Sequence, residues 1–292
     1  MSSDHQEVSN DSVLDDLAPG LDRSLHRQYI RGIFVLWFIM TVLGVLAGLY
    51  LTPILMPHMN SPEGRAAVKT VIVFTVAAAP VAALVCAVAL YSLLHTRHRG
   101  SLDHPPADGP PLRGNALASG VWLITSTLLV VFLLFWGLTE WSAQQVVHAD
   151  SLTINVIGQQ WIWDYNLPAQ TVRLPGGREL KIPKELALSK LNLPVDVPVT
   201  FNVTSKDVTH GFWPVNLGIQ VDANPGQRTV IRTVPDRLGK FVVRCSQLCG
   251  LNHAYMYTQA QVVPDQDFQA WVQGGARGPI LAVASSQNGS TK

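Results

Sequence analysis

The chain has 292 residues, of which 48% are hydrophobic and only 14% are charged. Soluble globular domains usually carry about 25% charged residues, so a large part of this chain is too apolar for an ordinary water-exposed fold. Its 21 Lys and Arg residues against 20 Asp and Glu residues leave a formal charge of +1, and this balance argues against a nucleic-acid partner. No repeat or charge block typical of collagen, a coiled coil or a disordered tail is present.

Three long uncharged runs dominate the first half of the chain. Residues 1–28 are polar and are predicted to form a cytoplasmic N-terminal tail. In the transmembrane region, residues 29–141, the runs predict helices at about 32–56, 70–95 and 115–139. Each run reaches the roughly 20 residues that a helix needs to cross a membrane. A buried soluble helix is the alternative for any one run, but three runs in succession favour membrane spans.

Positive charges are unequally shared between the two sides of these helices. One side has only Arg65 and Lys69, whereas the other has Arg23, Arg27, Arg31, Arg97, Arg99 and Arg113. Because Lys and Arg favour the cytoplasmic side, we expect everything after Trp141 to be extracytoplasmic in a multi-pass protein of the cell membrane. The first apolar run is longer than a signal-peptide core and no small-x-small cleavage site follows it. We therefore expect the first helix to be retained.

Residues 142–265 have the pattern of an all-β domain. Short β-rich runs such as Leu152–Ile157, Val197–Val203 and Phe241–Arg244 alternate with turns rich in Pro, Gly and Asn. Frequent short strands predict a sandwich or barrel, so the fold class is three transmembrane helices followed by an extracytoplasmic β domain. Residues 266–292 are predicted to form a loosely held C-terminal tail.

A cluster of metal-ligating residues lies near the end of the β domain. Cys245, Cys249, His253 and Met256 fall within twelve residues, and His210 precedes them by 35 positions. Thiolate and thioether donors favour copper(I), and imidazole suits copper in either oxidation state. A one-copper electron-transfer site uses two His, one Cys and a weak Met. The additional thiolate here could bridge two metal ions, each of which then takes one His, with Met or a backbone carbonyl completing the set.

Two simpler interpretations compete with a copper pair. Cys245 and Cys249 could form a disulfide in an oxidising compartment, which leaves both histidines and the methionine unexplained. A tetrahedral zinc site could use both cysteines with His210 and His253, which leaves Met256 unexplained.

These residues resemble the dinuclear CuA site of subunit II of haem–copper terminal oxidases. The resemblance covers residues 116–265 and includes Gly158–Trp163, His210–Trp213 and Gln220–Gly226, in the order found in that family. It implies a cupredoxin-like Greek-key β-barrel that accepts electrons from cytochrome c or a similar donor. The electrons would pass to haem in oxidase subunit I, where oxygen is reduced to water and protons are translocated.

Site residues follow from this resemblance one by one. Trp161 matches the aromatic residue that receives the electron from the donor, although it could also be an ordinary core aromatic. Asp207 and Asp222 match acidic positions near the site, or are solvated loop carboxylates. The implied copper ligands are His210, Cys245, the backbone carbonyl of Gln247, Cys249, His253 and Met256. The implied partners are oxidase subunit I, oxidase subunit III, the electron donor and the membrane.

Four departures from the family pattern limit the resemblance. Gln247 stands where many members have a Glu that helps hold magnesium, and an amide is a weaker, neutral ligand, which puts magnesium in doubt. The usual member has two membrane helices rather than three. Residues 116–121 lack a glutamate found in many relatives. From residue 140 onward, 13 Lys and Arg residues against 11 Asp and Glu residues give +2, so the outer domain is not acidic.

Other functions remain possible on this pattern. A CuA-containing nitric oxide reductase would have a similar small subunit, and only its partner subunit would distinguish it. A quinol oxidase subunit II lacks these ligands, so the intact set argues against that function. A membrane-tethered copper carrier for oxidase assembly needs exposed, exchangeable copper with few ligands, and a set of five ligand side chains predicts the opposite. No Cys-x-x-Cys-His motif occurs, so no covalent haem is expected in this chain.

Overall fold

The computed structural model describes residues 23–95, 115–143 and 150–278. The described residues form two compact units. The first, here called the helical unit, contains the chain up to Thr52 and Ile72–Phe135; the second, the outer unit, contains Pro53–Val71 and the chain from Trp136 onward. The outer unit therefore includes residues that precede the predicted β domain by many positions.

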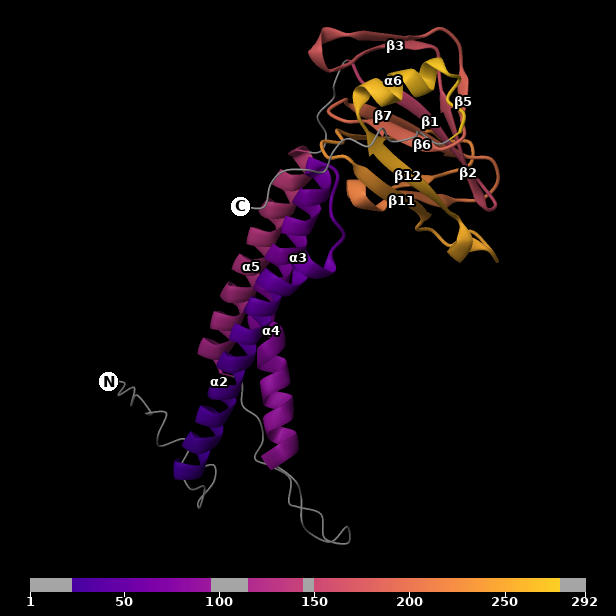
Figure 1. Ribbon diagram of the computed structural model, residues 1–292. Helices are drawn as coiled ribbons and strands as arrows, with labels where there is room; N and C mark the ends of the chain where they lie inside the picture. The colour runs from indigo at the N-terminus through magenta and orange to yellow at the C-terminus, as the bar shows by residue number, and fades with distance from the viewer. Residues whose placement is uncertain (1–22, 96–114, 144–149, 279–292) are drawn as a thin grey trace, which may run out of the picture. The chain divides into compact units, whose positions relative to one another are not determined.

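Within the described residues, three helices are long and apolar enough to cross a membrane, as the sequence predicted. The first is α2 (Arg23–Leu46), which continues through one π-helical turn (Ala47–Leu51) into α3 (Thr52–Leu55), and α4 (Pro62–His95) and α5 (Ala116–Ala143) are the others (Figure 1). Their apolar side chains are largely exposed, which is typical of helices whose surroundings are hydrocarbon rather than water.

The second helix begins earlier than expected. Its first residue is Pro62 rather than about residue 70, and Glu63 lies in its first turn. Proline is favoured at the first helical position, and an acidic side chain there interacts well with the helix dipole. Ser61 caps the helix, because its hydroxyl accepts a hydrogen bond of 3.0 Å from the Gly64 amide. Lys69, the charged residue that precedes the uncharged run, thus lies inside the helix.

The outer unit is built on two five-stranded sheets, with strand orders β10-β7-β1-β2-β5 and β6-β12-β11-β8-β9. A separate hairpin pairs β3 with β4. Most neighbouring strands are antiparallel, but β1–β7 and β6–β12 are parallel. The bounds are β1 Leu152–Gln159, β2 Ile162–Leu167, β3 Gln170–Arg173, β4 Glu179–Ile182, β5 Leu186–Leu188, β6 Leu191–Pro194, β7 Val199–Ser205, β8 His210–Pro214, β9 Val221–Ala223, β10 Thr229–Thr233, β11 Gly239–Cys245 and β12 Tyr257–Val263.

Alternating side chains explain how the two sheets make one core. Successive residues of β1 and of β7 alternate between buried and partly exposed positions, as expected for strands with one face inside. Phe201, Phe212 and Phe241 are almost fully buried between the sheets. The predicted fold class, membrane helices followed by a cupredoxin-like all-β domain, is confirmed, with the β domain arranged as two packed sheets.

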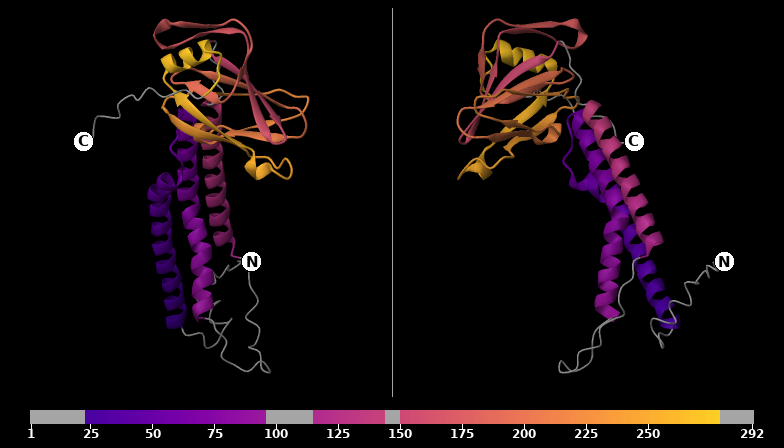
Figure 2. Two further views of the ribbon diagram at one scale, coloured as in Figure 1. Left: turned by 45° about the vertical axis from the view of Figure 1, so that its right-hand side comes forward. Right: turned by 180° about the vertical axis from the view of Figure 1, so that it is seen from behind.

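The prediction of a loose tail from residue 266 was wrong for its first part. Helix α6 (Asp265–Gln273), the yellow helix after β12 in Figure 2, buries Phe268, Trp271 and Val272. It lies next to β6. The spacing of these three residues gives the helix one apolar face that must be covered. Residues 279–292 lie outside the described part of the chain, as do residues 1–22 of the predicted N-terminal tail.

A short segment before α4 is attached to the outer unit, and we call residues 58–65 the clasp. The backbone amide of Asn60 donates a hydrogen bond of 2.7 Å to the backbone carbonyl of Asn216. The backbone carbonyl of Asn60 accepts one of 2.9 Å from the backbone amide of Asp236. The buried Ser61 hydroxyl donates a bond of 2.7 Å to the Leu217 carbonyl. These contacts make the clasp an integral part of the outer unit.

Side chains of the clasp add to this attachment. Arg65 forms a two-pronged ion pair with Asp236, and Thr233 donates a hydrogen bond of 3.0 Å to Glu63. A Cβ atom added to Gly218 would lie only 2.2 Å from the Cα atom of Gly64. The two backbones are therefore packed directly against each other, which only glycine permits.

Candidate metal centre

The candidate ligands come from two neighbouring strands and one loop. His210 opens β8, Cys245 closes β11, and the loop from β11 to β12 carries Cys249, His253 and Met256. Because β8 and β11 are antiparallel neighbours, with Cys245 opposite Phe212, His210 lies beside the start of this loop. The Cys245 amide donates a hydrogen bond of 3.0 Å to the Met256 carbonyl, which closes the base of the loop.

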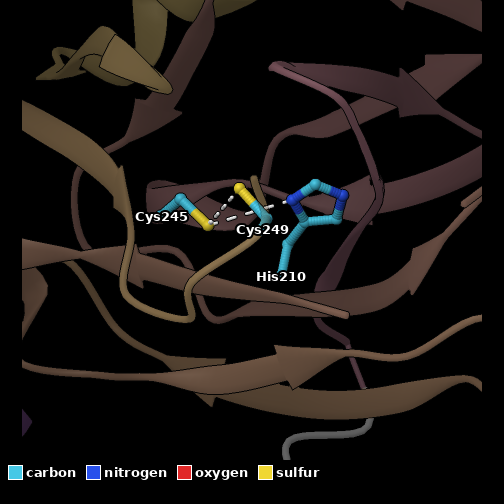
Figure 3. Close-up of side chains that lie close together, drawn as sticks. All are labelled: His210, Cys245 and Cys249. Carbon is cyan, nitrogen blue, oxygen red and sulfur yellow. Dashed lines mark hydrogen bonds between the residues drawn. The ribbon is translucent and has the colours of Figure 1, made fainter. Parts of the chain in front are cut away.

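Three of the predicted ligands form a tight, buried group. The ligand atoms of His210, Cys245 and Cys249 all lie within 4.8 Å of one another. The two sulfur atoms are 3.7 Å apart, and His210 Nδ1 lies 3.9 Å from Cys245 Sγ. Figure 3 shows the three side chains converging on one point. This group could hold a metal ion.

The remaining predicted ligands lie at the edge of this group. On one side, His253 Nδ1 is 3.6 Å and Met256 Sδ is 3.8 Å from Cys249 Sγ. On the other, the backbone carbonyl oxygen of Gln247 is 3.1 Å from Cys245 Sγ. The structure thus brings all six predicted donors together.

Cys245 and Cys249 are free thiols in this structure, and the 3.7 Å between their sulfur atoms is well beyond the 2.05 Å of a disulfide bond. Burial, and after it the neighbouring Cys245, raises the pKa of Cys249 to about 12. A metal binds the thiolate form, so metal binding to this pair must release protons.

Asp207 holds the imidazole of His210. Its Oδ1 atom lies 2.8 Å from His210 Nε2, which leaves Nδ1 facing Cys245. Burial opposes the ionisation of Asp207. Hydrogen bonds from the backbone amide of Gln160, from His210 and from the backbone amide of Val208 outweigh this effect and lower the pKa of Asp207 to about 2. A carboxylate on the far nitrogen of a ligand histidine fixes the tautomer and the ring orientation. Of the two acidic residues singled out in the sequence, only Asp207 contacts the cluster in this way; Asp222 is exposed on β9.

Trp161 lies against the ligand loop. It is partly buried and packs on the core of the outer unit. A Cβ atom added to Gly250 would come within 3.4 Å of the indole and within 2.9 Å of the side-chain nitrogen Nε2 of Gln160. Gly250 also has a φ of +122°, a conformation that favours glycine. Sequence reasoning missed Gly250 and Gln160; their positions beside Cys249 and Trp161 are the only signal that pointed to them.

Residues 152–263 match the family model described as cytochrome c oxidase subunit II, periplasmic domain. This domain belongs to the cytochrome c oxidase subunit II family. The match begins with the first residue of β1 and ends with the last residue of β12, so it covers both sheets and every candidate ligand of this subunit II domain.

Two curated relatives have the same family name. A probable cytochrome c oxidase subunit 2 of Rickettsia prowazekii is 29% identical over 167 residues, which are 54% of this chain and 53% of the relative. Cytochrome c oxidase subunit 2 of Pneumocystis carinii is 29% identical over 170 residues, 52% of this chain and 68% of the relative. The alignment therefore spans only about half the length of the Rickettsia protein.

One solved structure covers the subunit II domain alone. The periplasmic domain of subunit II of cytochrome oxidase from Bradyrhizobium japonicum is 29% identical and aligns over 44% of this chain and 96% of that chain, with a TM-score of 0.37.

The ligand loop of the subunit II domain carries exposed apolar side chains. Leu248, Leu251 and Tyr255 are all largely exposed, with Leu251 exposed to 91%. Leu248 directly precedes the buried Cys249, and Tyr255 directly precedes the buried Met256. The loop therefore turns Cys249 and Met256 inward and presents apolar side chains outward.

Proposed function

We propose that this chain is the electron-input subunit of a haem–copper respiratory oxidase. It would accept electrons from cytochrome c or a similar donor at a dinuclear copper centre and pass them to haem in subunit I. Oxygen would be reduced to water there, coupled to proton translocation. The observation that carries the proposal is the pair of buried thiols, 3.7 Å apart, with His210 beside one sulfur and His253 beside the other.

The donor set fits two copper ions better than one zinc ion. A tetrahedral zinc ion, with ligand bonds of about 2.0–2.3 Å, needs four donors that are all close to one another. His253 stands outside the group whose ligand atoms are mutually within 4.8 Å. Two shared thiolates with one histidine on each side instead match two ions, and the buried thioether of Met256 adds a soft donor that favours copper.

Residues of this chain would have separate roles in electron input and in holding the copper centre. Trp161 receives the electron at the surface and lies against the loop that holds Cys249. Asp207 fixes His210, and the burial of the thiols excludes water from the centre. The bound copper pair would supply one-electron redox chemistry in which the change of charge is shared by two metals.

The membrane helices and the family of the outer domain support the remaining parts of the proposal. The chain would lie in the cell membrane as a multi-pass protein, with the metal centre on the extracytoplasmic side. Its partners would be oxidase subunit I and subunit III. The Gln247 side chain is a weak ligand for magnesium, so the proposal includes copper alone.

Metal analysis and electron paramagnetic resonance on the purified full chain test the copper pair. We expect two copper ions per chain and, in the oxidised form, one unpaired electron shared between them. Cys86→Ser is the matched control, because it removes the one thiol of the helical unit and should leave the signal unchanged. A single zinc ion, or a one-copper signal with four hyperfine lines, would contradict the proposal.

Isolation of the chain with its partners tests the reaction. Co-purification with a haem-bearing subunit and oxygen consumption with reduced cytochrome c are expected. Nitric oxide consumption without oxygen consumption would indicate a reductase instead. Rapid loss of copper to a chelator, with no haem-bearing partner, would indicate a copper carrier.

A further inference from the structure

We infer that Gln160 is a positioning residue for electron input, holding Trp161 in a fixed place relative to both ligand-bearing segments. The inference rests on the proposed function. Its basis is a pair of hydrogen bonds made by this one residue. The Gln160 backbone amide donates to Asp207 Oδ2 at 2.7 Å, and its side-chain Nε2 donates to the Cys249 carbonyl at 2.8 Å.

These two bonds reach both halves of the metal centre. Asp207 uses its other carboxylate oxygen to hold His210, which belongs to β8. The Cys249 carbonyl belongs to the loop between β11 and β12. Gln160 is covalently next to Trp161, and its two hydrogen bonds connect Asp207, just before β8, with the ligand loop.

Gly250 shows how closely this contact is fitted. A Cβ atom there would lie 2.9 Å from Gln160 Nε2 and 3.4 Å from the Trp161 ring. The amide and the indole therefore lie side by side on the Cys249–Gly250 backbone. Loss of the hydrogen bond from Gln160 Nε2 would loosen the Cys249 peptide against the indole, and the distance from the ring to the Cys249 sulfur would become variable.

The chemistry of the side chain matters more than its bulk. An N–H donor at the end of a two-carbon chain is needed to reach the Cys249 carbonyl, and an ionised glutamate of the same shape has none. Gln160 is itself exposed, and exposed substitutions usually change stability by less than about 0.5 kcal/mol. Replacement of this residue should therefore alter the geometry of the site without unfolding the domain.

Gln159, the last residue of β1, provides a matched control one residue earlier in the chain. Its Nε2 atom donates a hydrogen bond of 3.0 Å to Asp164, and its Oε1 atom accepts one of 3.4 Å from Lys206. Gln160 lies in the turn that follows β1, and the contacts of the Gln159 side chain are with Asp164 and Lys206 rather than with the ligand loop. Gln159→Glu changes the same chemical group one residue away.

The test uses the assembled oxidase with Gln160→Glu, Gln160→Met, Gln159→Glu and Trp161→Ala. The step measured is the transfer of one electron from reduced cytochrome c, which is oxidised, to the copper centre, which is reduced. We expect both Gln160 variants to keep their copper and to lose about tenfold in the second-order rate, the lower end of the effect of outer-sphere partners at metal sites. Their paramagnetic resonance spectra should shift, whereas Gln159→Glu should match the unmodified protein in rate and spectrum.

Several outcomes would overturn the inference. Unchanged rates in both Gln160 variants, while Trp161→Ala is slow, would show that Gln160 does not position the indole. Loss of copper in both Gln160 variants would show that the residue supports the metal ligands rather than the electron path. If the unmodified chain holds no copper pair, the proposed function itself fails, and this is seen before any variant is compared.

Discussion

Asp207 and His210 are joined by a hydrogen bond of 2.8 Å between the carboxylate Oδ1 and the imidazole Nε2, three residues apart at the start of β8. This bond directs the other ring nitrogen toward Cys245. We expect Asp207→Ala to weaken copper binding by about 10- to 100-fold, the usual effect of removing such a partner. Competition with a graded series of copper chelators measures this, and Asp222→Ala should have no effect.

The copper signal should depend on a side chain at Cys249 but only on the backbone at Gln247. Cys249→Ser removes one of the two thiolates that we propose to be shared, so the mixed-valence signal should be abolished. Gln247→Ala keeps the carbonyl oxygen that lies 3.1 Å from Cys245 Sγ, so the signal should be nearly intact. Electron paramagnetic resonance of the full chain in detergent distinguishes the two. A strong loss in Gln247→Ala would show that the amide side chain takes part.

Electron input should be only weakly sensitive to salt. The outer part of the chain carries 13 Lys and Arg residues against 11 Asp and Glu residues, and strong electrostatic steering needs a concentrated field of one sign. Around the ligand loop, Leu248, Leu251 and Tyr255 are exposed instead. We expect the second-order rate of reduction by a lysine-rich cytochrome c to fall by less than about tenfold between low and physiological ionic strength, because strongly steered reactions change by 10- to 1,000-fold.

Two sets of variants check this prediction. A steep decrease with salt that disappears in the double variant Asp207→Asn, Asp222→Asn would show that an acidic site steers the donor. Trp161→Ala should slow electron input at every salt concentration and leave the copper in place. A normal rate in that variant would remove Trp161 from the path.

The ion pair between Arg65 and Asp236 should stabilise the outer unit in a pH-dependent way. Hydrogen bonds from the Arg65 guanidinium hold the pKa of Asp236 below its usual range. The stabilisation is therefore full above the pKa of an unfolded aspartate, about 3.9, and is lost as the pH falls through the lower folded value. Both side chains are partly exposed, so Asp236→Asn should cost at most about 1 kcal/mol at pH 7.

Thermal unfolding followed by tryptophan fluorescence measures this cost. A loss of 1 kcal/mol lowers the Tm of a domain of this size by about 2–4 °C. Asp222→Asn removes an exposed carboxylate of the same unit and serves as the control. The difference between Asp236→Asn and the unmodified chain should vanish in acid; if it persists where the carboxyl is protonated, the ion pair is not its source.

The features that sequence reasoning predicted are those with a local signal. Uncharged runs longer than 20 residues predict membrane helices without any knowledge of the tertiary structure. The spacing of Cys245, Cys249, His253 and Met256 is local too, since one loop carries all four. Only His210 required a long-range argument, and the family resemblance supplied its place in the ligand set.

The features that were missed depend on packing or on long-range pairing. Helix α6 was assigned to a tail because its apolar face, with Phe268 and Trp271, is short and lies among polar residues. The sequence did not predict the contacts of the clasp, because its partners Asn216 and Asp236 follow Asn60 by more than 150 positions. Gln160 carries no charge or metal-binding group, so its role is apparent only from the Cys249 carbonyl that it contacts.

The clasp has a consequence for how the chain is threaded through the membrane. Asn60 is hydrogen-bonded to Asn216 and Asp236, so these residues share one compartment. Between Asn60 and the outer strands the chain runs through α4 and α5, and a path that returns to its starting side makes an even number of crossings. If α4 and α5 both span the membrane, they cross it as a pair, whereas α2 crosses it singly. One buried asparagine and the distribution of arginines give the same topology by unrelated physical arguments.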